Sequence, residues 1–304
     1  MRTPTSTIFL TGLTGHLGAC LRRRLALSPR GWTWRALVRR PDEVQPEPGF
    51  TSILGDFTTS GDWTNALDGV DTVVHMGALT GKASRKEHFR VNFEGTRHLV
   101  RVARDRGVRR FLFVSSVAAG FNSLERYPYG AAKKAAEDAV LEAGFDTLIL
   151  RPTLIGGRRA PAFEALRRLA GLPIVPLFGG GTGRVQPIHG DDLADVLLDA
   201  LAADRFTGET LAVGGREQLS MAELVERLAE RMKGRPPHRI SIPLASTSLP
   251  LRCMEALLGG GRLPLTEGQL MSFVQDGVAE NPPWVESFLT HDIESMVAEA
   301  CGER

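Results

Sequence analysis

The sequence is short of features that would each indicate a different class of protein. Only three of its 304 residues are cysteines, Cys20, Cys253 and Cys301, and they lie far apart without the spacing of metal ligands. No hydrophobic run is long enough to span a bilayer, and the N-terminal residues lack the charged and apolar regions of a secretory signal. We therefore expect free thiols in a soluble, cytoplasmic protein, with no membrane partner and no metal.

The sequence also lacks a large excess of positive or negative charge. The formal net charge is +2, and short arginine runs at residues 22–24, 109–110 and 167–168 are spread along the chain. Such runs are most simply solvated helix faces, so nucleic acid is not an expected partner. A chain of this length can bury a substantial core and form about two domains.

What the sequence does contain is a glycine-rich turn near its start. Gly12, Gly15 and Gly18 follow the apolar run of residues 8–10 at a spacing of three. Glycine permits a positive φ and lets the backbone approach a ligand closely. Apolar residues recur at helical spacing over residues 17–27, so the turn leads into a helix whose free N–H groups and dipole suit a pyrophosphate. Together these features predict nucleotide binding.

Strands and helices alternate through the first half of the chain. Strands are expected at residues 8–10, 32–38, 52–54, 72–75, 110–114 and 147–150, and helices at residues 17–27, 63–67, 85–106 and 129–143. This alternation predicts an α/β fold, a Rossmann-type doubly wound parallel sheet.

A smaller, mostly helical C-terminal substrate domain is expected to complete the fold. Helices are predicted at residues 161–170, within 185–202 and at 220–232, with strands at 210–213 and 240–242 and a loop rich in proline and glycine over 173–183. The expected nucleotide-binding Rossmann domain comprises residues 1–155 and 186–215. The expected substrate-binding domain comprises residues 156–185 and 216–304.

The chain has only two tyrosines, Tyr127 and Tyr129. Lys133 follows Tyr129 by four residues, which places the two side chains one helical turn apart on the same face. A phenol is a poor base, with an ordinary pKa of about 10, but an adjacent ammonium favours the phenolate. Ser115 and Ser116 follow the strand of residues 110–114 and can donate a hydrogen bond to a substrate oxygen. In isolation the pattern is more often a surface tyrosine and a solvated lysine; after this sheet and this turn it predicts an acid/base site.

Several motifs together resemble the extended or atypical short-chain dehydrogenases/reductases, the NAD-dependent epimerase/dehydratase superfamily. They are the sequences at residues 11–18 (TGLTGHLG), 55–56 (GD), 75–78 (HMGA), 114–116 (VSS), 129–133 (YGAAK), 150–153 (LRPT) and 187–194 (PIHGDDLA). The resemblance covers residues 7 to about 215. Residues 265–269 and 276–278 are faintly similar to the branch related to an accessory subunit of respiratory complex I.

The resemblance implies a role for individual residues. Tyr129 would be the catalytic acid/base, Lys133 would bind the nicotinamide ribose and depress the pKa of the tyrosine, and Ser116 would orient the substrate oxygen. Asp56 would contact the adenine, and Asn92 would support the site. The cofactor-binding residues implied are Gly12, Thr14, Gly15, His16, Leu17, Gly18, Arg39, Arg40, Asp56, Phe57, Met76, Gly77, Ala78, Asn92, Ser115, Tyr129, Lys133 and Pro152.

The end of the strand of residues 32–38 bears on the choice of cofactor. In this fold an acidic residue there binds the ribose 2′-hydroxyl, while an arginine accommodates a 2′-phosphate. The chain has Arg39 and Arg40 at this point, and the nearest acids, Asp42 and Glu43, lie beyond Pro41. We therefore predict NADP, with NAD as the alternative.

Two departures from the family pattern bear on the reaction. Only twelve residues separate Ser116 from Tyr129, where sugar-nucleotide members usually have a longer loop. Val117 and Ala118 stand where sugar dehydratases carry an Asp-Glu pair, so dehydration has no obvious acid/base agent. The leading expectation is an NAD(P)-dependent oxidoreductase acting on a hydroxyl or carbonyl of a small-molecule substrate. An epimerase with tightly bound NAD(P) and a non-catalytic NAD(P)-binding subunit or sensor remain open, and a homodimer is the one protein partner considered.

Other polar residues are expected to be structural. His75 ends a buried strand and is predicted to be a hydrogen-bonded core histidine. Asp191 and Asp192 suit a helix N-terminus better than a metal. Arg184 is left open between a substrate anion and an ordinary loop position.

Overall fold

The centre of the protein is a parallel sheet of seven strands, seen in a computed structural model that describes residues 6–40, 49–244 and 270–302. The sheet has the order β11-β6-β5-β4-β1-β2-β3, and every neighbouring pair is parallel. The strand order reverses between β1 and β4, and ligands bind at the carboxyl edge of such a point. The predicted Rossmann-type fold is confirmed. Its strands are β1 (Thr7–Thr11), β2 (Thr33–Val38), β3 (Phe50–Leu54), β4 (Thr72–His75), β5 (Arg110–Val114), β6 (Asp146–Pro152) and β11 (Thr210–Val213).

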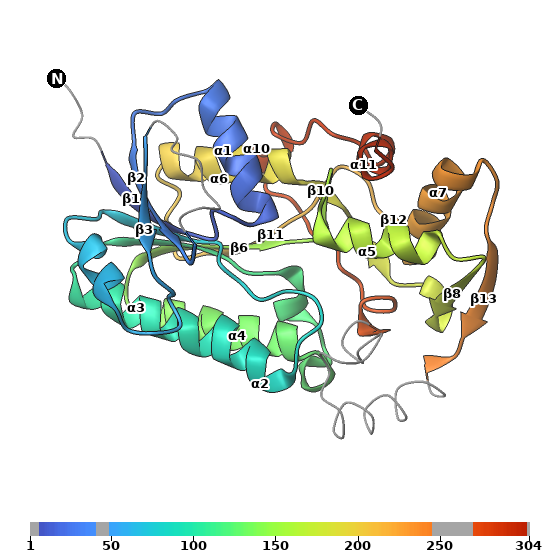
Figure 1. Cartoon of the computed structure of the whole chain (residues 1–304), viewed down its shortest axis with the longest axis horizontal. Helices are drawn as coiled ribbons and strands as arrows, with labels where there is room; N and C mark the ends of the chain where they lie inside the picture. Colours follow the sequence, from blue (N-terminus) through green and yellow to red (C-terminus); the bar gives the residue numbers. More distant parts are fainter. Residues whose placement is uncertain (1–5, 41–48, 245–269, 303–304) are drawn as a thin grey trace.

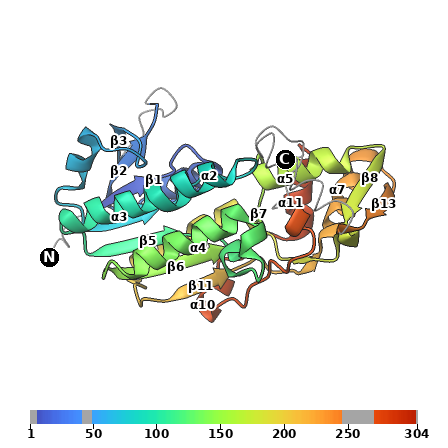
Figure 2. The same cartoon turned by 90° about the horizontal axis from the view of Figure 1, so that it is seen from below.

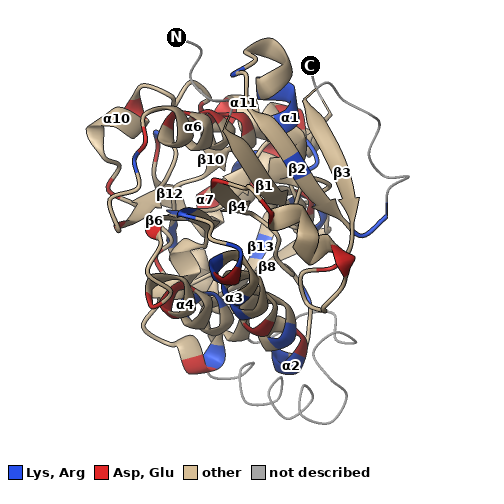
Figure 3. Ribbon diagram, turned by 90° about the vertical axis from the view of Figure 1, so that its left-hand side faces the viewer, with Lys and Arg blue, Asp and Glu red and all other residues tan. Residues whose placement is uncertain are grey.

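Helices cover both faces of the sheet (Figure 1). One face carries α1 (His16–Leu27) and α6 (Gly190–Ala202), and the other carries α3 (Thr96–Asp105) and α4 (Pro128–Leu141), as the end-on view of Figure 3 also shows. Ile8 and Leu10 pack with the α1 and α6 side chains, whereas Phe9 packs with those of α3 and α4. Burial on both faces explains why the strands are almost continuously apolar.

The long helix predicted at residues 85–106 contains a π-helical segment. It consists of α2 (Arg85–His88), the π-helix η3 (Phe89–Gly95) and α3. Ser84 and Glu87 form a capping box at its start. Segments of this kind occur often at functional sites, and this one contains Asn92.

The smaller unit lies at one end of the molecule (Figures 1 and 2). It contains α5 (Pro161–Ala170), α7 (Met221–Lys233) and α11 (Ile293–Ala300), which share one hydrophobic cluster. The prediction of a loop over residues 173–183 was wrong, because β8 (Ile174–Phe178) pairs there with β13 (His238–Ile242). Pro176 lacks an N–H group, but a strand with only one partner tolerates that.

The last part of the chain crosses between the two units. Residues 216–304 were predicted to belong to the substrate domain, yet Val285 and Leu289 pack in the hydrophobic cluster of α1 and α6. Val285 lies in α10 (Pro283–Glu286). The division into two domains stays a prediction. Among the described helices, none has the length and apolar character needed to cross a bilayer.

Candidate active site

The glycine turn joins β1 to α1, and its three glycines meet different surroundings. Gly12 has a φ of +88°, and a Cβ there would lie 2.8 Å from the backbone nitrogen of Gly77. A Cβ at Gly18 would lie 2.3 Å from the carbonyl oxygen of Leu13. At Gly15 a Cβ would meet only the carbonyl oxygen of Gly12, at 3.3 Å. Gly12 and Gly18 thus allow close packing, while Gly15 is exposed at the start of α1.

The exposed start of α1 is suited to an anion. The N-terminus of α1 has no side-chain cap and no acidic residue in its first turn, so its N–H groups are available to a pyrophosphate. Thr14 is exposed beside it, and Leu17 is buried in the core. His16 is half-buried with its Nε2 atom 3.3 Å from the carbonyl oxygen of Gly156, and burial lowers the pKa of His16.

The residues predicted at the adenosine end lie on the neighbouring strands. Arg39 and Arg40 are exposed directly after β2; Asp42 and Glu43 lie outside the described residues. Asp56 accepts hydrogen bonds on Oδ1 from the backbone N–H and the hydroxyl of Thr58, at 2.8 and 2.7 Å. Phe57 lies so close to Gly77 and Gly95 that a Cβ at either glycine would be within 3.0 Å of its ring.

His75 connects the glycine turn to the π-helical segment. Its ring is fully buried, and burial holds its pKa well below the usual value, so the imidazole is neutral. Nε2 lies 2.9 Å from the hydroxyl of Thr96, which donates to the carbonyl oxygen of Asn92. Nε2 therefore carries the proton, and Nδ1 accepts from the Thr11 hydroxyl at 2.5 Å. Thr11 in turn accepts from the N–H of Gly77. The prediction of a structural histidine is confirmed.

Asn92 holds the loop that follows β4. Its side chain accepts from the N–H of Leu79 at 2.7 Å and donates to the carbonyl oxygen of Leu79 at 2.9 Å. This loop contains Met76, half-buried, Gly77, buried, and Ala78, exposed. Asn92 thus holds in place the loop that contains three of the implied cofactor-binding residues.

Ser116 and Tyr129 meet at the carboxyl end of β5. Ser116 begins the short helix η4 (Val117–Gly120), and its hydroxyl accepts from the N–H of Ala118 at 3.2 Å. Tyr129 lies in the first turn of α4. Burial raises the pKa of Tyr129 to about 12, while a side-chain hydrogen bond with Ser116 acts in the opposite direction. The phenol is therefore protonated at neutral pH.

Lys133 lies one turn further along α4 and is 1% exposed. Its Nζ atom donates to the carbonyl oxygen of Val114 at 2.7 Å and lies 4.0 Å from the ring centre of Phe113. Burial lowers the pKa of Lys133 to about 7, and the negative charge of Glu137 opposes this shift. The expectation that Lys133 depresses the pKa of Tyr129 was wrong here, because burial outweighs other influences on the phenol and Nζ is directed to Val114.

The residues present fit a dinucleotide along this edge of the sheet. The open turn at Gly15 suits the diphosphate, and the fixed loop at Gly77 and Ala78 lies beside β4. Ser115 is 4% exposed, and its Oγ atom has no hydrogen-bond partner among the described residues. A buried hydroxyl without a partner costs about 1–3 kcal/mol, and a bound cofactor would supply one. Pro152 is buried at the end of β6.

Sequence comparison agrees with this geometry. The family model described as the NAD dependent epimerase/dehydratase family matches residues 8–214. The chain belongs to the NAD-dependent epimerase/dehydratase family. It is therefore an enzyme of the short-chain dehydrogenase/reductase superfamily, as the motifs predicted, and its family binds NAD.

Relatives of this epimerase/dehydratase-family enzyme differ in what their names say they act on. It is 35% identical over 241 residues to a ceramide reductase of Caulobacter vibrioides, covering 78% of this chain and 73% of the relative. It is 33% identical over 262 residues to sterol demethylase protein B of Methylococcus capsulatus, covering 78% and 77%. The structure of MoeE5 in complex with UDP-glucuronic acid and NAD has the same fold, with a TM-score of 0.71 and 21% identity over 97% of this chain and 98% of that one.

Sequence reasoning missed two charged residues below the site. Glu137 follows Lys133 by four residues on α4, and Arg151 lies in the LRPT motif at the end of β6. The guanidinium donates to both carboxylate oxygens, at 2.8 and 2.6 Å. The four-residue spacing from Lys133 was the signal that would have found Glu137.

Three histidine and acidic side chains lie close enough to suggest a metal site. His189, His291 and Glu299 have ligand atoms within 4.8 Å of one another. The two imidazoles are stacked, with ring centres 3.8 Å apart, so their in-plane lone pairs run side by side and do not converge on one ion. His189 also caps α6 by accepting from the N–H of Asp191. This geometry favours a packing role for the two histidines over the binding of a metal ion.

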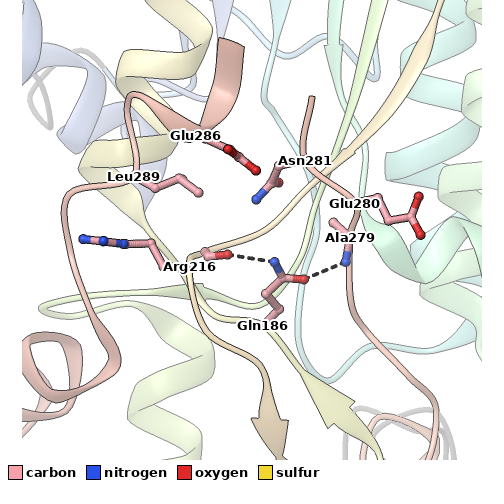
Figure 4. Close-up of a pocket in the computed structure, with 8 residues that line it drawn as sticks. Gln186, Arg216, Ala279, Glu280, Asn281, Glu286 and Leu289 are labelled. Carbon is pink, nitrogen blue, oxygen red and sulfur yellow. Dashed lines mark hydrogen bonds between the residues drawn. The ribbon is translucent and has the colours of Figure 1, made fainter. Parts of the chain in front are cut away.

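A cavity of about 640 Å³ is lined by residues that include Gln186, Gly215 and Ala279, and by none of the predicted site residues. Figure 4 shows Gln186 at its floor, donating to the carbonyl oxygen of Gly215 at 2.7 Å and accepting from the N–H of Ala279 at 2.8 Å. Gln186 therefore fastens the C-terminal stretch to the loop after β11. Arg184, nearby, is exposed and hydrogen-bonded to the side chain of Gln218.

Proposed function

We propose that this enzyme is an oxidoreductase that transfers hydride between NAD(P) and a hydroxyl or carbonyl group of a small molecule. The observation that carries the proposal is the meeting of Ser116 and Tyr129 at the carboxyl end of β5. Both lie at the same sheet edge as the glycine turn of β1, two strands away. In such folds this edge is where ligands bind.

Each residue has a distinct task in this reaction. Bound NAD(P) would supply hydride to a carbonyl carbon, or accept it in the reverse direction. Ser116 would hold the carbonyl oxygen by a hydrogen bond, and Tyr129 would donate its proton to that oxygen as it becomes a hydroxyl. Because the pKa of Tyr129 is about 12, the phenol is in the acid form that reduction needs. Oxidation would need the phenolate, so its rate would rise with pH.

The side chains around Tyr129 favour an apolar substrate. The ring of Tyr127 lies 6.0 Å from that of Tyr129, and Phe121 stacks on Tyr127 at 5.7 Å. Val117 fills a position next to Ser116 and lies close to Gly277. The side chains of Phe121, Tyr127 and Val117 carry no carboxylate, and the names of two relatives refer to a ceramide and to sterols, both apolar molecules with oxygen functions.

A turnover assay on Tyr129→Phe tests the mechanism. Ketones and secondary alcohols of apolar molecules, together with sugar nucleotides, would be screened by the absorbance of reduced nicotinamide. Proton transfer by a positioned group contributes about a hundred- to ten-thousand-fold, so Tyr129→Phe should lose activity on that scale and keep its cofactor affinity. Tyr127→Phe removes a hydroxyl two residues away and should stay near normal. Near-normal turnover by Tyr129→Phe would reject the mechanism.

The choice of cofactor is part of the proposal. We infer a preference for NADP from Arg39 and Arg40, which are exposed where the 2′-phosphate would lie. Calorimetric titration of both nucleotides should show tighter binding of NADP, and Arg39→Asp should weaken that preference. Equal or tighter binding of NAD by the unaltered chain would overturn it.

A further inference from the structure

Beneath the active site a buried carboxylate is paired with a half-buried guanidinium. Glu137 on α4 is 1% exposed, and Arg151 on β6 holds its carboxylate through two hydrogen bonds. Removing charges from water is expensive, and such a pair is weak evidence for a gain in stability. The pair is therefore expected to have a role other than stabilising the fold.

The position of the pair suggests that role. Tyr129, Lys133 and Glu137 follow one another at intervals of four residues on α4, so they occupy one face of the helix. Lys133 is as deeply buried as Glu137. Both charged groups are shielded from solvent, and charges interact strongly in such surroundings.

Other titratable groups near Lys133 contribute little charge. On β4, His75 is buried and neutral. Tyr127 and Tyr129 have their pKa values raised by burial and stay protonated. On α2, His88 has its pKa lowered by burial and lies with its ring 5.8 Å from that of Tyr129. Asp138 forms an ion pair with Lys134 on the outer side of α4. Glu137 is therefore the carboxylate that acts on Lys133, and Arg151 is the cation that balances it.

We propose that Glu137 and Arg151 form a positioning pair that sets the charge carried by Lys133, and through it the charge presented to cofactor and substrate. The inference rests on the proposed function, with Lys133 at the nicotinamide ribose as the family resemblance implies. The effect of the pair on Lys133 does not depend on a bound cofactor. Glu137 favours the ammonium, and Arg151 limits that effect by neutralising Glu137. The two members of the pair thus act on Lys133 in opposite directions.

Because the two residues act on Lys133 in opposite directions, substituting each of them tests the proposal. Glu137→Gln and Arg151→Gln each remove one charge and keep a side chain that can hydrogen-bond to the partner. The chain has five lysines, so lysine side chains labelled with ¹³C can be followed by NMR as the pH changes, with Lys133→Arg identifying the signal. The midpoint of Lys133 should fall in Glu137→Gln and rise in Arg151→Gln, by about one pH unit each. Asp138→Asn is the control and should leave the midpoint in place.

The outcomes separate the pair's effect from a purely structural role. If the pair were purely structural, both substitutions would lower the melting temperature and leave the midpoint of Lys133 unchanged. That result would overturn the proposal, and so would shifts of the midpoint in the same direction in both variants. If one variant does not fold, the direction in which the midpoint of Lys133 shifts in the other variant decides whether the proposal holds.

A second measurement distinguishes this inference from the proposed function. The pH dependence of NADP affinity should move with the Lys133 midpoint. Should the midpoint move while the affinity profile does not, the pair's effect on Lys133 stands and the assignment of Lys133 to the cofactor fails.

Discussion

Gly12, Gly15 and Gly18 look alike in the sequence but differ in what a side chain would meet at each. Gly12 and Gly18 lie against backbone atoms and serve the packing of the turn. Gly15 is exposed, and a Cβ there would make a single contact, with the carbonyl oxygen of Gly12. The spacing of the glycines predicted a phosphate turn, but it could not tell which glycine serves the fold and which the cofactor, because that depends on β4 and on residues of the turn itself.

Gly15→Val should therefore weaken cofactor binding far more than it weakens the fold. The added side chain meets one carbonyl oxygen at 3.3 Å and would occupy the path of the pyrophosphate. Calorimetric titration with NADP, alongside thermal unfolding, measures the two effects separately. Gly18→Ala is the contrasting variant, since its Cβ would lie 2.3 Å from the Leu13 oxygen and should lower the melting temperature. Undiminished nucleotide binding by folded Gly15→Val would mean that the cofactor site lies elsewhere.

At the scale of the element, the helix α4 carries both a proposed catalytic residue and charged residues buried in the core. Its first turn brings Tyr129 to Ser116, and its next turns bury Lys133 and Glu137 against β5 and β6. Helical spacing predicted the first two residues on one face. It gave the wrong direction for the pKa of Tyr129, because the burial of the phenol comes from tertiary packing of α4 against α2 and η5 (Leu124–Arg126), which helical spacing alone does not describe.

The buried lysine of α4 should make stability depend on pH. The pKa of Lys133 is about 7 in the fold and 10.5 ordinarily. Between these values the unfolded chain binds a proton that the folded chain does not, so the free energy of unfolding rises with pH over this window. The difference between the natural chain and Lys133→Met should grow by about 1 kcal/mol per pH unit from pH 7 to 10. Urea denaturation at several pH values measures it; Lys134→Met, at a more exposed position, should give a flat difference. A flat difference for Lys133→Met would contradict the burial of a neutralised ammonium.

Most strands of the sheet could be predicted because each is a short, almost continuously apolar run that is visible in the sequence itself. The strands at β1, β4 and β5 are buried on both faces, and their composition shows it directly. The π-helical segment and β8 could not be predicted, since each depends on a distant partner. Asn92 needs the loop at Leu79, and β8 needs β13, more than sixty residues later.

At the scale of the whole molecule, Asp192 fastens the C-terminal stretch to the Rossmann core. Its carboxylate is 2% exposed and accepts bonds from the backbone N–H groups of Thr290 and His291 and from the Thr290 hydroxyl. The His291 ring adds a further bond at 2.7 Å. Asp192 also lies in the first turn of α6, the helix N-terminus that the sequence predicted for it.

Asp192→Asn should loosen this attachment. Hydrogen bonds to a charged group contribute about 1.5–3 kcal/mol, so the variant should lose stability on that scale and show faster hydrogen exchange in α11. Denaturation and exchange mass spectrometry measure the two effects. Asp195→Asn, on the same helix, removes a surface ion pair with Arg24 and should change stability by at most about 1 kcal/mol. Equal losses in the two variants would show that Asp192 is not a fastening point.

The same attachment has a consequence for how the protein is made. The residues that satisfy Asp192 come 98 and 99 positions after it, and a ribosome adds about 5–20 residues per second. For roughly 5 to 20 seconds the nascent chain therefore holds α6 without the residues that cover it. The buried carboxylate of Asp192 can therefore gain its hydrogen-bond donors only after residues 290 and 291 have been synthesised.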